Sequence, residues 1–364
     1  MLAPGFLQLR PTVMPVSSSC NLRCRYCYCK FYCNRQAQSW RRHMMRQDVL
    51  KTVMRKFMDE YPGYISFCWH GGEPLLAGKK FFREVVRVQR EFRKEGQEVE
   101  NRLQTNGTLI DREWAEFFKD NGFKIGVSID GPKSINDKQR LFASGDGAFT
   151  RIMNGIDALR RTGITFSVLA TITSESVGHP EEIYRFVIEQ KFNAIKLNPC
   201  FGTSDLSVDL VEYAHFMNRV FDLWFADDRE DISFGHLNDI INGLLGGKPR
   251  ICHMRNSCYR HVKIDYNGDV LPCDSFLGRD LNFGNIVTQG ICEIVNSSNY
   301  RDFFNESRRI LDECAQCKWL RFCNGGCSRY TFDGEMEKGP NKMCAAKKIM
   351  FEHISQALGS IVRI

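Results

Sequence analysis

Sixteen cysteines, most of them in two groups, constrain this chain of 364 residues more than any other feature. Three lie between residues 20 and 27, and nine lie between residues 252 and 344, of which all but Cys292 form the second group of eight. In a short secreted chain this count would indicate a disulfide scaffold, but this chain is long and its first residues lack the pattern of an export signal. We therefore expect a cytoplasmic protein whose reduced thiols act first as metal ligands.

Residues 12–200 alternate short apolar segments with helical patterns. Strands are expected at 64–69, 124–129, 164–171 and 194–197, and helices at 47–60, 79–93, 111–119, 148–161 and 181–190. This alternation is typical of a parallel sheet with crossover helices, either open or closed into a barrel. Polar and glycine clusters at 71–74, 105–107 and 130–132 fall where strands should end, so we expect them to form one wall of a single pocket.

The pattern changes after about residue 205. Helical stretches at 210–225 and 236–245 lead into a segment rich in Cys, Gly and Asn. There Asn267-Gly268, between the apolar runs 262–266 and 270–271, predicts a β-hairpin. The segment would bury little apolar surface by itself, so we expect bound metal to stabilise it.

Composition narrows the possible functions. With 43% hydrophobic and 26% charged residues, the chain is typical of a globular protein. It has no run of 18 apolar residues, which argues against a membrane-spanning helix. A net charge of +7 is only mildly basic and argues against a nucleic-acid partner.

The first cysteine group has the spacing C-x3-C-x2-C, formed by Cys20, Cys24 and Cys27. Three thiolates would hold a four-iron cluster and leave one iron open, since such clusters normally take four. A structural zinc site completed by Cys29 or Cys33 is the alternative. The spacing alone does not choose between them.

Together with Gly71-Gly72-Glu73-Pro74 after a later strand, this motif resembles the radical S-adenosylmethionine (SAM) superfamily. The resemblance implies an α/β fold with a partial (β/α)6 barrel over roughly residues 10–200, in which SAM chelates the open iron. Reductive cleavage of SAM then yields a 5′-deoxyadenosyl radical that abstracts a substrate hydrogen. By the same resemblance, the expected cofactor contacts are Tyr26, Gly71, Gly72, Glu73, Asn106, Ser128, Arg140 and Phe201.

Among these contacts, Glu73 and the peptide groups of the two glycines would bind the methionyl ammonium of SAM. Ser128 and Arg140 would hold its carboxylate or ribose. The alternatives are a packing role for Tyr26 and Phe201 and a surface position for Arg140.

The eight later cysteines suit two fully ligated four-iron clusters, or equally two zinc sites. Their order resembles the SPASM extension of radical SAM enzymes, which carries two auxiliary clusters and would bring the total to three [4Fe–4S] clusters. Family register assigns Cys252, Cys258, Cys273 and Cys327 to the first, and Cys314, Cys317, Cys323 and Cys344 to the second. The expected domains are a radical SAM barrel at 1–205, a helical connector at 206–248 and a small cysteine-rich α+β SPASM domain with a C-terminal helix at 249–364. Of the other cysteines, we expect Cys68 and Cys200 to be small buried hydrophobic residues and assign no role to Cys29 or Cys33.

Within that group the chain resembles the anaerobic sulfatase-maturating enzymes, which oxidise a cysteine or serine of a sulfatase to formylglycine. The resemblance implies a peptide or protein substrate, a reducing partner such as flavodoxin or ferredoxin, and Asp274 as the base. The alternative role for Asp274 is a turn aspartate. The segments that carry the resemblance are 103–118, 128–132, 221–224, 273–274 and 317–327.

Some positions depart from that family. His70 stands where glutamine is usual, Asn136 replaces a histidine, and the segment 196–200, which begins with Lys196, is more polar. These departures keep a second enzyme class open, the maturases that form thioether or carbon–carbon crosslinks in ribosomal precursor peptides. A non-catalytic iron–sulfur or zinc scaffold is the third alternative.

Overall fold

The computed structural model describes residues 8–29, 43–202, 205–273, 276, 281–331 and 339–359. Within these residues ten strands form one sheet in the order β10-β9-β8-β1-β2-β3-β4-β5-β6-β7. Neighbouring strands from β8 to β7 in this order are parallel, and the β8–β9 and β9–β10 pairs are antiparallel. The strands are β1 Arg10–Val13, β2 Tyr64–Trp69, β3 Glu98–Thr105, β4 Lys124–Ser128, β5 Phe166–Ile172, β6 Ala194–Pro199, β7 Ser233–Phe234, β8 His261–Ile264, β9 Asp269–Leu271 and β10 Gly284–Asn285.

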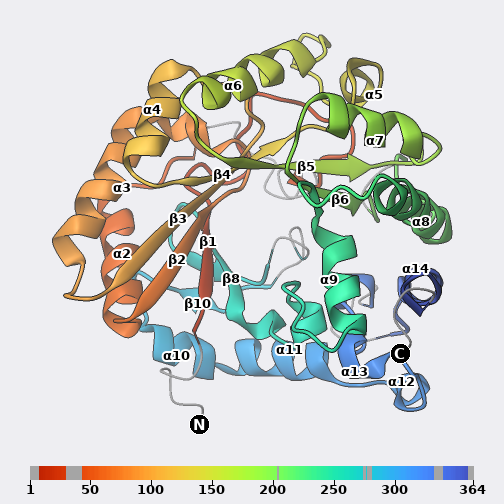
Figure 1. The fold of residues 1–364 in the computed structure, drawn as a ribbon. Helices are drawn as coiled ribbons and strands as arrows, with labels where there is room; N and C mark the ends of the chain where they lie inside the picture. Colours follow the sequence, from red (N-terminus) through yellow and green to blue (C-terminus); the bar gives the residue numbers. More distant parts are fainter. Residues whose placement is uncertain are drawn as a thin grey trace.

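Helices connect the parallel strands and cover the outer face of the sheet, as Figure 1 shows for α2, α3, α4 and α6. This is the partial (β/α)6 barrel expected from the sequence, and the sheet does not close. The helices of this part are α2 Gln47–Glu60, η2 Pro74–Ala77, α3 Gly78–Phe92, α4 Arg112–Asp120, α5 Lys133–Gln139, α6 Phe149–Arg161, α7 Pro180–Glu189, α8 Leu210–Ala226 and α9 Gly235–Leu244. Those of the C-terminal part are η3 His253–Arg255, η4 Cys258–Arg260, α10 Ile291–Asn296, α11 Ser298–Arg308, α12 Asp312–Ala315, α13 Leu320–Cys323, η6 Ser328–Tyr330 and α14 Cys344–Gly359.

Aromatic side chains fill the layer between the sheet and α3 and α4. Trp69 of β2 is fully buried and packs edge-to-face on Phe82, whose ring also meets Trp114. Burying one such side chain contributes about 1.5–3 kcal/mol, so this layer is a main source of barrel stability. It fixes the helix-facing side of each strand and leaves the alternate residues to face the interior.

Strand β3 is the longest of the parallel strands that the apolar pattern misses, and its helix-facing side includes the polar Asn101. Asn101 and Gln89 of α3 exchange two amide hydrogen bonds, at 2.8 and 3.0 Å. The indole nitrogen of Trp69 also donates to Asn101, at 2.9 Å. A satisfied polar network thus replaces the apolar residue that the alternation would require.

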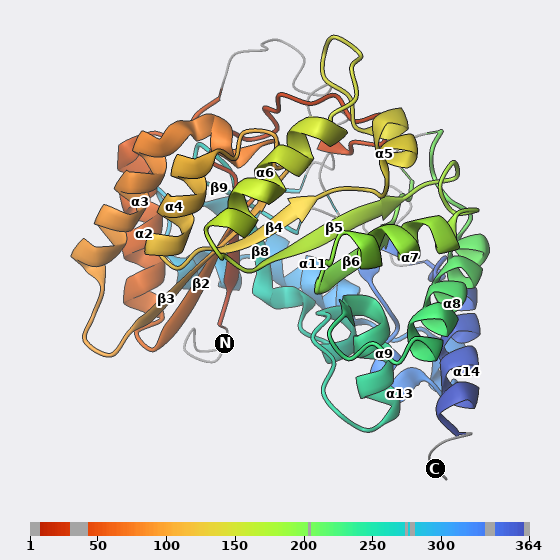
Figure 2. The same ribbon diagram turned by 45° about the horizontal axis from the view of Figure 1, so that its top comes forward.

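The hairpin predicted around Asn267-Gly268 is present as β8 and β9. Strand β8 also pairs in parallel with β1, from Arg10 opposite His261 to Val13 opposite Ile264. This pairing places β8 beside β1 within the same sheet (Figure 1), and Figure 2 shows the hairpin strands β8 and β9 from a second direction. Backbone hydrogen bonds therefore join the cysteine-rich segment to the barrel, while the division into domains at residues 205 and 248 remains a proposal.

The C-terminal helix α14 packs against α8, and both views show the two side by side. His353 of α14 lies 2.6 Å from Asp222 of α8, nitrogen to carboxylate oxygen. In the part of the chain that the structure describes, no helix is long and apolar enough to cross a membrane.

Candidate active site and cluster sites

The first cysteine group lies on the loop that follows β1, at the carboxyl end of the parallel strands. Backbone hydrogen bonds hold this loop: the amide of Arg23 donates to the carbonyl of Leu141 at 2.6 Å, and that of Arg25 to the carbonyl of Gln139 at 2.9 Å. Cys20, Cys24 and Cys27 form no disulfide with another described residue. Backbone hydrogen bonds to the segment 139–141 therefore hold the loop that carries them.

The Gly71-Gly72 pair docks directly on the residues that precede Cys20. The amide of Gly72 donates to the carbonyl of Ser17, and the amide of Glu73 donates to that of Ser19, both at 2.8 Å. A Cβ on Gly72 would lie 2.0 Å from the Ser19 oxygen, and one on Gly71, where φ is 119°, would lie 2.5 Å from the Ser17 oxygen. The glycines are required for this close backbone approach.

Glu73 is fully buried between the ends of β2 and β3. Its carboxylate accepts hydrogen bonds from the amide of Leu75 at 3.0 Å, the hydroxyl of Thr105 at 2.8 Å and the amide of Asn106 at 2.7 Å. Burial raises its pKa to about 7, and no lysine or arginine of the described residues pairs with it. A buried carboxylate that has only neutral donors fits a cationic ligand group such as an ammonium.

Asn106 links this carboxylate to the cysteine loop. Its side-chain nitrogen lies 3.7 Å from the sulfur of Cys20 and donates to the side-chain oxygen of Asn21 at 2.9 Å. Its own oxygen accepts from the amide of Thr108 at 3.0 Å. Asn106 thus lies beside Cys20, and its expected contact with the cofactor remains a proposal.

Tyr26 and Arg140 meet on Asp130, which the sequence marked as part of a strand-end cluster but to which it gave no role. The Tyr26 hydroxyl donates to one oxygen of Asp130 at 2.7 Å, and Arg140 pairs with the other at 2.9 Å. Asp130 is fully buried and Arg140 is 5% exposed, so the surface alternative for Arg140 is wrong. The Nε atom of Arg140 is buried and has no partner among the described residues, which leaves one donor for an anionic ligand.

The other two expected cofactor contacts lie farther along the strand ends. Ser128, at the end of β4, accepts a hydrogen bond from Gln104 of β3 at 2.9 Å. The ring of Phe201, after β6, lies 4.9 Å from that of Tyr330, and the Phe201 carbonyl accepts from Arg329 at 3.1 Å. Phe201 therefore also joins the barrel to the cysteine-rich segment.

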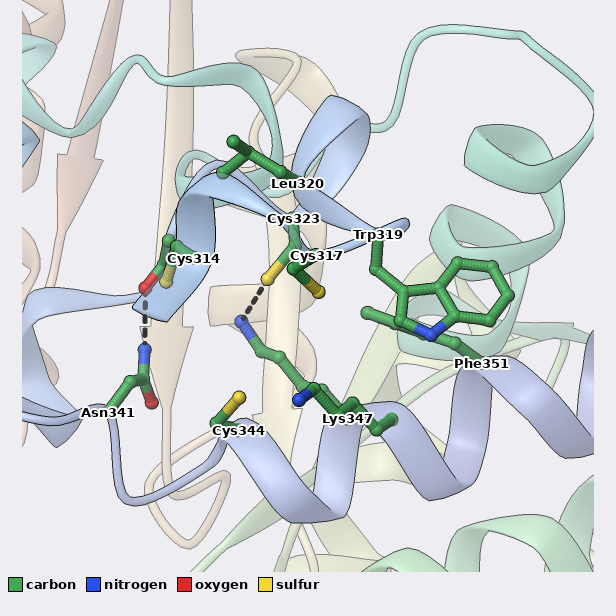
Figure 3. Close-up of a pocket in the computed structure, with 11 residues that line it drawn as sticks. Cys314, Cys317, Trp319, Leu320, Cys323, Asn341, Cys344, Lys347 and Phe351 are labelled. Carbon is green, nitrogen blue, oxygen red and sulfur yellow. Dashed lines mark hydrogen bonds between the residues drawn. The ribbon is translucent and has the colours of Figure 1, made fainter. Parts of the chain in front are cut away.

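Four cysteines of the second group line one pocket between α12, α13 and the start of α14 (Figure 3). They are the four that family register assigns together: Cys314, Cys317, Cys323 and Cys344. A pocket lined by four thiols and closed by the rings of Trp319 and Phe351 fits a fully ligated iron–sulfur cluster. In the described part of the chain, no group of three His, Cys, Asp or Glu side chains converges on the position of one metal ion.

Three of the remaining four assigned cysteines flank the short helices η3, η4 and η6, and the fourth, Cys273, follows β9. Cys252 directly precedes η3, and Cys258 begins η4. The side chain of Asn324 donates to the carbonyl of Met254 at 3.0 Å, which joins η3 to the segment that leads to Cys327. The assignment of these four cysteines, Cys273 among them, to one cluster remains a proposal.

Some expected residues fall outside the described residues or differ from expectation. Asp274 and Cys33 lie outside the described residues. Cys200 is buried as expected, but Cys68 is only half-buried because it lies on the face of β2 opposite Phe67 and Trp69. Lys196 lies exposed on β6.

Known protein families match both the barrel and the cysteine-rich part of this chain. The radical SAM superfamily matches residues 14–187, and the SPASM iron–sulfur cluster-binding domain matches residues 252–318. A cysteine-type anaerobic sulfatase-maturating enzyme of Clostridium perfringens is 32% identical over 94% of this chain and 95% of its own length. A serine-type enzyme of Bacteroides thetaiotaomicron is 29% identical over 97% of this chain and 91% of its own.

A solved structure, native anSMEcpe with bound AdoMet and Cp18Cys peptide, superposes with a TM-score of 0.86 at 29% identity and covers 97% of this chain and 99% of the other. The similarity thus extends from the cysteine loop after β1 through the pocket of the second cysteine group. This chain therefore belongs to the anaerobic sulfatase-maturating enzymes, radical SAM oxidoreductases that carry a C-terminal iron–sulfur cluster-binding domain.

Proposed function

We propose that this enzyme oxidises a cysteine of a peptide or protein substrate, in the first place a sulfatase, to formylglycine. The observation that carries the proposal is the nearly full-length similarity to a cysteine-type relative, 32% identical over 94% of this chain. The buried Glu73, which suits the ammonium group of SAM, and the four-thiol pocket, which suits an iron–sulfur cluster, support it.

Three four-iron clusters are proposed. Cys20, Cys24 and Cys27 would hold the first, and the two sets of four later cysteines would hold the others. When bound, the first cluster and SAM supply the radical that removes hydrogen from the substrate. Around them, Glu73 would neutralise the SAM ammonium and the free Nε donor of Arg140 would bind its carboxylate.

Asp274 is proposed to remove the proton from the substrate thiol. It follows Cys273 directly, so a carboxylate there would lie beside the auxiliary cluster of that cysteine. To act, it must be ionised and within hydrogen-bond reach of the thiol. The Asp274→Asn variant should lose peptide product while it still cleaves SAM, and full product formation would reject the base role.

The direct test uses protein reconstituted under anaerobic conditions, SAM, a reductant and a sulfatase peptide that contains cysteine. About twelve irons per chain are expected, four for each cluster. Mass spectrometry should show a peptide that has lost two hydrogens and exchanged sulfur for oxygen. A flavodoxin or ferredoxin is the proposed electron donor in a cytoplasmic setting, with dithionite as the chemical substitute.

The same assay separates the alternatives. Loss of two hydrogens without the exchange would indicate a crosslink and reject formylglycine formation. Conversion of a matched serine peptide, but not the cysteine peptide, would assign the serine-type reaction. Zinc without iron, and no 5′-deoxyadenosine, would indicate the non-catalytic scaffold.

A further inference from the structure

A buried lysine faces the pocket of the second cysteine group. Helix α14 begins at Cys344, and Lys347 follows three residues later, on the same side of the helix. Lys347 is only 6% exposed, and its ammonium lies 3.8 Å from the sulfur of Cys323. Figure 3 shows its side chain reaching from α14 toward Cys323. Lysine is rarely buried to this degree without a compensating partner.

The surrounding backbone leaves room for this ammonium. A Cβ on Gly326, where φ is 84°, would lie 2.9 Å from the Lys347 nitrogen and 2.2 Å from the side-chain nitrogen of Asn341. Asn341 in turn donates to the carbonyl of Gly325 at 2.8 Å, and its oxygen accepts from the amide of Met343 at 2.9 Å. The turn before Cys327 and the start of α14 thus form a fitted space for the lysine.

The charge of Lys347 is not neutralised locally. No carboxylate among the described residues forms a salt bridge with it, and its hydrogen bond is to the Cys323 sulfur. The charge of Lys347 also acts on the buried His236. Burial lowers the pKa of His236 to about 4, and the charges of Lys196 and Lys347 contribute to this shift. A charge that is felt in the interior is poorly screened by water.

We propose that Lys347 raises the reduction potential of the cluster held by Cys314, Cys317, Cys323 and Cys344 by donating a charged hydrogen bond to the Cys323 sulfur. The inference rests on the cluster assignment in the proposed function, but not on the identity of the substrate. Reduction adds one electron to the cluster and makes it more negative. A neighbouring positive charge and an N–H donor to a ligand sulfur both stabilise the reduced form, and such hydrogen bonds are known determinants of cluster potential.

Lys348 provides a matched control within the same pocket. It lines the pocket from the next position of α14 but is exposed, so water screens its charge. Lys347 and Lys348 have the same charge and side-chain length and differ chiefly in burial. If net charge alone set the potential, removing either lysine would have the same effect.

The experiment measures midpoint potentials by electron paramagnetic resonance on the full-length, reconstituted protein without peptide. A Cys20→Ala, Cys24→Ala and Cys27→Ala background removes the first cluster, so that only the auxiliary clusters are titrated. We expect Lys347→Met to make one-electron reduction of one cluster at least tenfold less favourable, a shift of 59 mV to more negative potential. Lys347→Gln, which keeps an N–H donor without the charge, should shift less, and Lys348→Met least.

A Lys347→Met potential that is unchanged, raised, or equal to that of Lys348→Met would overturn the proposal. If Lys347→Met loses iron, the potential of Lys347→Gln tests the proposal instead: a more negative value than that of Lys348→Met supports it, and an equal value rejects it. If both variants lose about four irons per chain, Lys347 holds the cluster in place and the tuning role is rejected. Because the titration contains no peptide, the measured potentials test the role of Lys347 even if the enzyme does not form formylglycine.

Discussion

The two cysteine regions of this molecule are held in different ways. The first loop is fixed by backbone hydrogen bonds to the segment Gln139–Leu141 and by the glycines that pack on Ser17 and Ser19. The C-terminal region consists of short helices of three to six residues around its thiols, apart from α11 and α14. From this comparison we predict that backbone bonds preorganise the cluster site of the barrel, whereas the proposed clusters of the C-terminal region would complete its fold.

The largest expected difference appears when one cysteine of each region is replaced. Cys20→Ala should reduce 5′-deoxyadenosine formation to background while the barrel stays folded, because backbone bonds hold the loop. Cys323→Ala should instead increase amide hydrogen exchange across residues 312–331, where a cluster ligand is lost. Equal loss of protection in both regions for either variant would contradict the contrast.

Next in size, Gly72→Ala should impair loading of the first cluster while the other sites still load. An added Cβ would lie 2.0 Å from the Ser19 oxygen, so the loop must move. Iron content and SAM cleavage measure the effect. Gly63→Ala is the matched control, because nothing lies within 4 Å of a Cβ at Gly63. Normal SAM cleavage by Gly72→Ala would show that the loop tolerates the displacement.

A smaller effect is expected from Asp130→Asn, which leaves the buried Arg140 without its anionic partner. Breaking a buried ion pair in this way typically costs about 3–5 kcal/mol, so the free energy of unfolding should fall by that amount. Asp157→Asn removes an exposed pair with Arg160 and should cost about 0.3–0.5 kcal/mol. Urea denaturation of both variants checks the prediction, and similar values for the two would argue against a structural role for the buried pair.

The smallest effect concerns the pH dependence of apo-protein stability through Glu73. Its pKa is raised to about 7 in the folded state from 4.5, so the folded state binds the proton more tightly. Stability from this group is therefore complete below about pH 4.5 and is lost as the pH rises through 7, at most about 3 kcal/mol. Glu73→Gln should lose less stability between pH 5 and 8 than the wild type, measured by denaturant titration. If the stability of the wild type and of Glu73→Gln changed with pH in parallel, the titrating group would not be Glu73.

Much of the barrel could be predicted from local patterns. Helix α2 has the expected bounds, and strands β2 and β4 agree with prediction to within a residue. Strand β3 was missed because Asn101 occupies a core position, and only its pairing with Gln89 across the fold satisfies that amide. The charges of Glu100 and Arg102 on the opposite face further hide the apolar alternation of this strand.

The sequence predicted those parts of the candidate site in which metal binding requires a particular spacing of residues along the chain. The three closely spaced thiols and the Gly-Gly-Glu turn can be recognised in the sequence as a candidate site. The pocket brings together the four later cysteines assigned to one cluster. The sequence did not reveal that Tyr26 and Arg140 share Asp130, because residues more than one hundred positions apart meet there. The contact between Lys347 and Cys323 was also missed, since a lysine on a helix is ordinarily solvated.

Residue spacing alone predicts most of the barrel helices, several of its strands, the two thiol groups and the family, because each of these depends on the order of residues along the chain. Tertiary structure decided that β8 joins β1, that Glu73 is buried with only neutral donors, and that Lys347 rather than Lys348 faces the thiols. These features depend on which surfaces exclude water when distant segments pack. The free energy of a buried charge depends on the residues around it, and because these come from distant segments, a local sequence pattern does not predict it.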